Sequence, residues 1–228
     1  MPMARGFDVL RLVAANPLPS ASAVRQRFRP DAIALVKNED LLDAAYSYRI
    51  VPLEQPVGPT MRLEGEQFDA PMLLPASGEL TALACCVCTV GSKLSQRSTA
   101  LFGERKPSLA LALDDLANEL LFAVARRAQD RILADCMRRG LTASGELNAG
   151  DPGLSITAHE AVVKLSWAHA IGVKLNHGEQ LVPLKSTTMI MGVGHDLPRS
   201  VFSRCELCPS RFKCTLKHTT EGLSAFAG

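Results

Sequence analysis

The sequence lacks the features that mark membrane-spanning, secreted and nucleic-acid-binding proteins. Its longest apolar run, from about Leu80 to Val90, is strand-sized and well short of the roughly 20 residues that cross a bilayer. Residues 1–16 contain two arginines and Asp8 and no small-residue cleavage site, so we interpret them as an amphipathic helix, not a signal peptide. The net charge of +2 is too small for a surface that follows a phosphate backbone. We therefore expect a cytoplasmic protein that binds neither membranes nor nucleic acid.

Motifs for catalysis and nucleotide binding are missing as well. Gly192-Val193-Gly194 has neither the third glycine nor the following helix of a dinucleotide fingerprint, and no phosphate-loop glycines precede Lys185-Ser186. Asp114 and Asp115 are better explained as residues that complement a helix dipole than as an acid/base pair. We assign no catalytic residue from the sequence.

What remains is the composition of a folded domain: 47% apolar and 21% charged residues. The order of patterns (helices, strands, a long helix, a loop, a helix, strands) predicts an α+β fold with an antiparallel sheet. We expect this domain over residues 1–198 and a Cys-rich tail over 199–228. The predicted helices cover residues 7–15, 20–28, 31–45, 92–101, 108–139 and 157–172. The predicted strands cover residues 46–53, 60–63, 80–90, 173–176, 180–184 and 187–193.

Four local predictions are specific enough to be tested. The strand at 60–63 should pair back onto the strand at 46–53, and the polar, Gly-rich segment 143–152 should be a loop. Thr157 with Glu160 should form a capping box for the following helix. The long helix should bury one stripe of side chains spaced by three and four residues: Leu113, Leu116, Leu120, Val124, Ile132, Cys136 and Met137.

The seven cysteines form three groups, and an odd number in a reducing compartment argues against a disulfide framework. Cys85, Cys86 and Cys88 lie in the apolar run, where Cys86 and Cys88 would share one side of a strand and Cys85 the other. We interpret them as small core residues, with the alternative that one of them completes a metal site with the tail. Cys136 belongs to the stripe of the long helix and is also predicted to be core.

The third group, Cys205, Cys208 and Cys214, is predicted to bind a metal centre. Two cysteines with two residues between them can direct both sulfurs to one metal, and thiolates select zinc or iron–sulfur clusters over hard cations. Neighbouring Arg and Lys side chains would favour the thiolate form, and Pro209 follows Cys208 as in ferredoxin-like cluster motifs.

Three readings of this tail stay open. A [4Fe–4S] cluster, which we favour, needs a fourth ligand from elsewhere or leaves one iron open. A zinc ion could take His218 as its fourth ligand and form a complete structural site. The third reading is three thiols without a metal.

A series of local motifs also runs through the chain in a defined order. They are Val9-Leu10-Arg11, Tyr48–Leu53, the strand ending at Cys88-Thr89-Val90-Gly91, Leu113-Asp114, Asn148–Asp151, and Leu181–Ser186 before a strand that ends in Gly192. Together they resemble the activation domain of cobalamin (vitamin B12)-dependent methionine synthase and its free-standing relatives. The resemblance spans most of the chain, and free-standing members often end in a Cys-rich tail.

The resemblance implies an accessory role in corrinoid-dependent methyl transfer. In the family, the domain binds S-adenosylmethionine and presents it to oxidised cobalamin, which an electron donor reduces. The partners would be a corrinoid-binding protein or methyltransferase and that electron donor. By resemblance, the cofactor groove would be formed by Asn148, Gly150, Asp151, Lys185 and Ser186. The resemblance leaves open whether the chain is itself an enzyme component. The alternative function is that of a non-catalytic, zinc-stabilised interaction module on the same fold.

One departure from the family bears on the ligand. The family loop reads Arg-x-x-Pro-Gly-Tyr, and its arginine and tyrosine serve the S-adenosylmethionine site. Aligning the glycine with Gly150 places Glu146 at the arginine and Asp151 at the tyrosine. A carboxylate cannot pair with the carboxylate of the ligand but could engage its amino or sulfonium group. The resemblance therefore predicts the fold better than it predicts S-adenosylmethionine binding.

Overall fold

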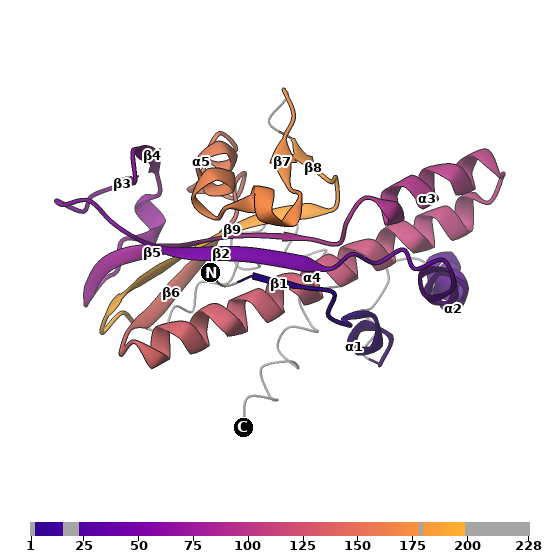
Figure 1. The fold of residues 1–228 in the computed structure, drawn as a ribbon, viewed down its shortest axis with the longest axis horizontal. Coiled ribbons are helices and arrows are strands. Elements are labelled where there is room, and N and C mark those ends of the chain that lie inside the picture. Colours follow the sequence, from indigo (N-terminus) through magenta and orange to yellow (C-terminus); the bar gives the residue numbers. More distant parts are fainter. Residues whose placement is uncertain (1–2, 16–22, 178–179, 199–228) are drawn as a thin grey trace.

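A central antiparallel sheet organises the molecule. The structure is a computed structural model of the 228-residue chain and describes residues 3–15, 23–177 and 180–198. Five strands lie in the order β1-β2-β5-β9-β6, and each is antiparallel to its neighbour (Figure 1). Their bounds are β1 Met3–Arg5, β2 Ala45–Pro52, β5 Glu79–Thr89, β9 Ser186–His195 and β6 Thr142–Leu147. The predicted α+β class with an antiparallel sheet is confirmed.

Both faces of the sheet are covered (Figure 1). One face carries α1 (Leu10–Ala15), α2 (Ala23–Asn38), α3 (Lys93–Gly103) and the long α4 (Pro107–Arg138). The other carries α5 (Ala158–Leu165), η1 (Pro71–Leu73), η2 (Ala168–Ile171) and two small hairpins. These hairpins are β3 (Thr60–Leu63) with β4 (Glu66–Asp69), and β7 (Lys174–Leu175) with β8 (Leu181–Val182).

The apolar run on β5 is continuous because each face of this central strand enters a different core. Ala84, Cys86 and Cys88 pack toward α4, in what we call the α4-side core. Leu83, Cys85 and Val87 pack toward α5, in the α5-side core. Side chains alternate along a strand, so a strand covered on both faces needs apolar residues at every position.

Helix α4 confirms the predicted long helix and nearly all of its stripe. Leu113, Leu116, Leu120, Val124, Ile132 and Cys136 are buried. Met137 is an exception, since its exposed fraction is 77%. It lies one residue beyond Cys136, and a step of about 100° around the helix axis turns it toward solvent. Pro107 starts the helix, where its missing N–H costs little.

The N-terminal prediction was wrong in two respects. The segment expected to be one amphipathic helix contains the edge strand β1 before α1. The two helices expected at 20–28 and 31–45 are a single α2, which continues through Pro30 and ends at Asn38. Packing explains the continuity, because Ala32 and Val36 are buried against α4 and Arg29 forms a salt bridge with Glu119 at 2.5 Å. These contacts offset the backbone hydrogen bond that proline removes.

The predicted partner of strand β3 and the predicted loop at 143–152 were also wrong. Strand β3 pairs with β4, which was not expected, and not with β2. The tight turn between them has positive φ at Glu64 (47°) and Gly65 (81°), as hairpin turns of type I′ require. The segment expected as a loop over 143–152 begins as the edge strand β6, which pairs with β9 and has an irregularity between Ser144 and Leu147. An edge strand with a bulge tolerates such polar, Gly-containing sequence.

The predicted capping box and the single helix over 157–172 were wrong as well. Thr157 makes no side-chain cap bond, and its hydroxyl lies 2.9 Å from Ser155 Oγ. The helix stops after α5, because Trp167 adopts a left-handed conformation (φ 56°) before η2. Its ring covers the guanidinium of Arg49 at 4.5 Å. This cation–π contact accompanies the break.

A buried carboxylate ties α4 to the sheet. The Tyr48 hydroxyl on β2 donates to Asp135 Oδ2, and Arg138 and Arg131 of α4 also contact this carboxylate. Tyr48 is fully buried and the Asp135 side chain is only 8% exposed. Burial raises the pKa of Tyr48, so its hydroxyl remains a donor at neutral pH.

We expect Tyr48→Phe to lower the free energy of unfolding by about 1–2 kcal/mol, because a buried acceptor loses its donor. Asp135→Ala should lower the free energy of unfolding by more, about 2–3 kcal/mol, because it removes the shared acceptor and leaves the buried Tyr48 hydroxyl unpaired. Urea unfolding of both single variants and the double variant measures the coupling. Additive effects of the two substitutions would contradict a direct interaction.

Candidate functional site

Three of the predicted site residues form one tight turn after β6. Asp151 Oδ2 accepts hydrogen bonds from Asn148 N at 2.9 Å and from Asn148 Nδ2 at 3.0 Å, and Asp151 N donates to the Asn148 carbonyl at 2.9 Å. Gly150 has φ 91°, a conformation that suits glycine, and its N–H donates to the Leu154 carbonyl. The sequence thus specifies a closed turn, which we call the Asn148 turn (residues 148–151).

The other two predicted residues lie at the start of β9. Lys185 Nζ lies 2.8 Å from both Asp114 Oδ1 and Asn118 Oδ1 of α4. Its side chain is 13% exposed, so it fastens this end of β9 to α4. Ser186 Oγ donates to the Pro183 carbonyl at 2.7 Å and lies 2.8 Å from Thr89 Oγ1.

The structure brings these two groups to the same end of the sheet. Thr187 Oγ1 lies 3.4 Å from Asn148 Oδ1, and the Ala149 N–H donates to Thr188 Oγ1 at 3.4 Å. The Asn148 turn therefore rests on the two residues that follow Ser186. The Lys185 side chain contacts Asp114 and Asn118 of α4 instead.

Glu146, at the position of the family arginine, lies beside α4. Its Oε2 accepts a hydrogen bond from Gln129 Nε2 at 3.1 Å. This carboxylate does not fit the carboxylate end of an amino acid ligand, since two negative groups repel. With the family loop aligned on Gly150, Glu146 therefore does not reproduce the expected arginine contact.

A groove lies between the β3–β4 hairpin, the start of α5 and Asp151 of the Asn148 turn. Its volume is about 620 Å³. Asp69 and Asp151 are the charged residues of its lining, and Phe68, Pro71 and Leu154 supply apolar surface. We call it the α5 groove; Thr60, Gln67, Gly153, Ser155, Thr157 and Ala158 complete its lining.

Sequence reasoning named Asp151 but missed Asp69 and the groove. Strand β4 is short and polar, and its residues have no helical or strand periodicity that stands out. The available signal was Glu64-Gly65, a turn dipeptide directly after the alternating residues of β3. A hairpin at this point would have placed Asp69 opposite Thr60, as observed, with Asp69 Oδ1 accepting from Thr60 Oγ1 at 2.6 Å.

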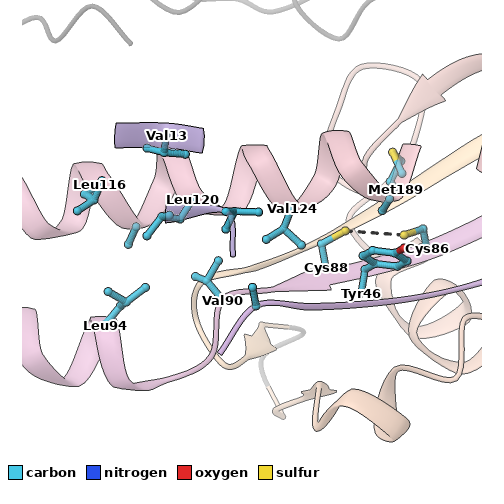
Figure 2. Close-up of a cluster of buried hydrophobic side chains, with 14 of the residues drawn as sticks. Val13, Tyr46, Cys86, Cys88, Val90, Leu94, Leu116, Leu120, Val124 and Met189 are labelled. Atoms are coloured by element: carbon cyan, nitrogen blue, oxygen red, sulfur yellow. Dashed lines mark hydrogen bonds between the residues drawn. The ribbon is translucent and has the colours of Figure 1, made fainter. Parts of the chain in front are cut away.

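The four described cysteines are core residues, as predicted. The sulfur atoms of Cys86 and Cys88 lie 3.8 Å apart beneath α4, near Tyr46 and Met189 (Figure 2). Burial raises the pKa of Cys85 to about 12 and the pKa of Cys86 well above its ordinary value, so both stay protonated at neutral pH. A metal ligand must be a thiolate, and burial of this kind disfavours it.

No three His, Cys, Asp or Glu side chains gather into a metal-binding group within the described ranges. The predicted ligands Cys205, Cys208 and Cys214 lie outside the described residues, as does the whole predicted tail domain 199–228. In the part of the chain that the structure covers, no helix is both long enough and apolar enough to cross a membrane.

Comparisons with known proteins identify the fold. A scan against protein-family models finds no match, and a search of curated proteins finds none either. Among solved structures, the chain is similar to the crystal structure of the MetH reactivation domain bound to AdoHcy. The TM-score is 0.58 and the sequence identity 15%, and the match covers 96% of this chain and 81% of that one. The chain therefore has the reactivation-domain fold, as the sequence motifs predicted.

Proposed function

We propose that this protein is an accessory of corrinoid-dependent methyl transfer that assists the reductive reactivation of a partner corrinoid protein. One observation carries the proposal: the likeness to the MetH reactivation domain extends over 96% of the chain. A shared fold does not by itself define a function, so the residues must supply the rest. The role requires a surface that positions two cofactors, and it requires no nucleophile from this chain.

The reaction transfers one electron and then one methyl group. A donor reduces the oxidised cobalt of the partner by one electron, and the reduced cobalt then accepts a methyl group from a methyl donor. The electron pair of the new cobalt–carbon bond comes from cobalt, and the donor leaves without its methyl group. This chain would act as the activation component, and the corrinoid would stay on the partner.

The end of the sheet that carries the Asn148 turn is our candidate for the positioning surface. It gathers Asn148, Gly150 and Asp151 from one loop with Lys185 and Ser186, which lie where β9 begins. Asn148 is buried and hydrogen-bonded on both sides, so it would hold the turn in shape rather than contact a ligand. Gly150 is exposed at the tip, where a cofactor could approach the backbone closely.

The electron path would run through the tail. Cys205, Cys208 and Cys214 would hold an iron–sulfur cluster, with [4Fe–4S] favoured, which receives an electron from a separate donor. A zinc ion at the same residues would instead stabilise an interaction module without an electron-transfer role. The four described cysteines support this division of roles, because their burial disfavours the thiolate form that a metal ligand needs.

Reactivation of a corrinoid protein from the same organism tests the proposal. We expect the anaerobically purified full-length chain to raise the rate of cobalt reactivation by at least about tenfold, because positioning the reactants removes part of the entropic barrier. The visible absorbance of the corrinoid, with a low-potential reductant and a methyl donor present, measures this rate. Heat-denatured protein is the control, and equal rates with native and denatured protein would contradict the proposed function.

A further inference from the structure

The second half of helix α4 has an exposed surface that combines apolar and basic side chains. Helices α2 and α3 pack beside the first half of α4, at Glu119 and Ala110 (Figure 1). In the second half, Ala128, Ile132 and Cys136 are buried in the α4-side core, and the side chains on the opposite side of the helix are exposed. We call these exposed residues the α4 outer face: Phe122, Arg126, Arg127, Asp130, Arg131, Leu133, Met137 and Arg138.

Three large apolar side chains lie in one stripe of this face. Phe122, Leu133 and Met137 are all exposed. Leu133 and Met137 are about one helical turn apart, and Phe122 lies about three turns before Leu133, so the three side chains are aligned. A single exposed apolar residue is ordinary on a protein surface, whereas several that are aligned on one helix are typical of a surface that binds a partner.

Positive charge borders this stripe. Five arginines and two aspartates lie between Phe122 and Arg139, the C-cap of α4. Asp135 is buried and lies against two arginines at once, Arg131 and Arg138. A single carboxylate does not neutralise two guanidinium groups, so the α4 outer face keeps a surplus of positive charge.

Contacts within the domain hold these arginines in place. Arg126 Nη1 donates to Gln129 Oε1 at 2.9 Å, and the guanidinium of Arg127 lies 4.8 Å from the centre of the Phe7 ring. The two arginines on the buried carboxylate are half-exposed, so part of their guanidinium groups can reach a partner. Side chains that are already ordered lose less conformational entropy when a partner binds.

We propose that the α4 outer face docks the acidic surface of a partner protein. Carboxylates of the partner would pair with the arginines, and its apolar residues would cover Leu133 and Met137. Charge complementarity argues for this partner, and arginine and methionine are enriched in protein interfaces. Nucleic acid fits less well, because Phe122 is the only aromatic residue of the α4 outer face on which a base could stack.

This inference goes beyond the proposed function and does not depend on it. The α4 outer face belongs to the helix that covers one side of the sheet. The Asn148 turn packs through Ala149 against the α5-side core, on the other side of the sheet. A partner on α4 would therefore leave the candidate positioning surface accessible.

Two synthetic helical peptides of about 18 residues test the proposal, since this length spans the second half of α4. Both carry the same leucine stripe, and the remaining positions are glutamates in one peptide and lysines in the other. Calorimetric titration of the full chain should give a dissociation constant at least about tenfold lower for the acidic peptide, because opposite charges attract and like charges repel. Added salt should reduce this difference.

Variants locate the binding surface. Arg126→Glu should raise the dissociation constant of the acidic peptide about three- to tenfold, and the double variant with Arg127→Glu should raise it more than tenfold. Met137→Ala should raise it about three- to tenfold through lost apolar contact. Arg62→Glu on β3 and Leu184→Ala alter exposed residues of the same kinds elsewhere, and they should leave the constant within about twofold. Thermal unfolding checks that each variant is folded.

Four results would overturn the inference. The first is equal affinity for the two peptides, including an absence of binding, as expected if the chain itself covers the α4 outer face. The second is an equal loss of affinity in the control variants. The third is tighter binding of duplex DNA or phosphatidylglycerol vesicles through the same arginines, which would assign the face to a phosphate-bearing partner. The fourth is a dimer of the free chain that Met137→Ala dissociates in light scattering, which would assign the face to a second copy.

Discussion

Gly194→Ala is expected to lower the free energy of unfolding by about 3 kcal/mol or more. A Cβ atom at this position on β9 would lie 1.8 Å from the Glu79 carbonyl oxygen and 3.0 Å from Leu80 Cα. Both obstacles are backbone atoms of β5, so no side-chain rotation can relieve the overlap. The irregularity in the β5–β9 ladder between Leu80 and Ala82 lies beside this contact. The close approach there depends on glycine.

Chemical unfolding followed by circular dichroism measures this effect. Gly58→Ala is the matched control, since a Cβ at Gly58 has no neighbour within 4 Å and its φ is not positive. Its stability should stay within about 1 kcal/mol of the parent protein. A Gly194→Ala variant as stable as the Gly58→Ala variant would show that β5 and β9 are not as closely apposed as the structure has them.

Cys208→Ser is expected to remove most of the iron or zinc bound to anaerobically purified, tag-free protein. The serine hydroxyl is a poor ligand for soft metals, and Cys208 belongs to both the Cys-x-x-Cys pair and the longer Cys208–Cys214 spacing. The main domain should stay folded, because its two cores are formed by residues before the tail. Metal analysis with visible absorbance gives the metal content and distinguishes iron–sulfur from zinc.

Two further variants sharpen this experiment. Cys136→Ala alters a core cysteine of α4 and should leave the metal content unchanged. His218→Ala should reduce the metal content only when zinc is bound by three cysteines and His218. Metal content that Cys208→Ser does not change, or parent protein with neither iron nor zinc, would contradict the predicted metal centre.

The sequence was most informative where burial imposes a periodicity. The stripe of α4, except Met137, and the apolar run of β5 were predicted correctly, because the stripe packs into one core and the two faces of β5 pack into both cores. Prediction failed at edge elements. The β3–β4 hairpin was missed although its Glu64-Gly65 turn is a local signal, whereas the polar, partly exposed strand β6 pairs with the distant β9. Local pattern alone does not contain that information.

The candidate site was predictable only in part for the same reason. Asn148, Gly150 and Asp151 were found together because a turn is a local structure. The proximity of Asp69 to Asp151 depends on how the β3–β4 hairpin folds back onto α5, across 82 positions of sequence. The break at Trp167 was equally hidden, since its left-handed conformation accompanies a contact with Arg49 that lies far away in the chain.

The placement of the cysteines has a practical consequence for handling the protein. Cys85, Cys86, Cys88 and Cys136 are buried on strand β5 and helix α4, so we expect the intact domain to protect them from oxidants in solution. Covalent dimers that form in air must therefore be linked through Cys205, Cys208 or Cys214. If those three sulfurs bind the predicted metal centre, a ladder of reducible species on a gel would report its loss.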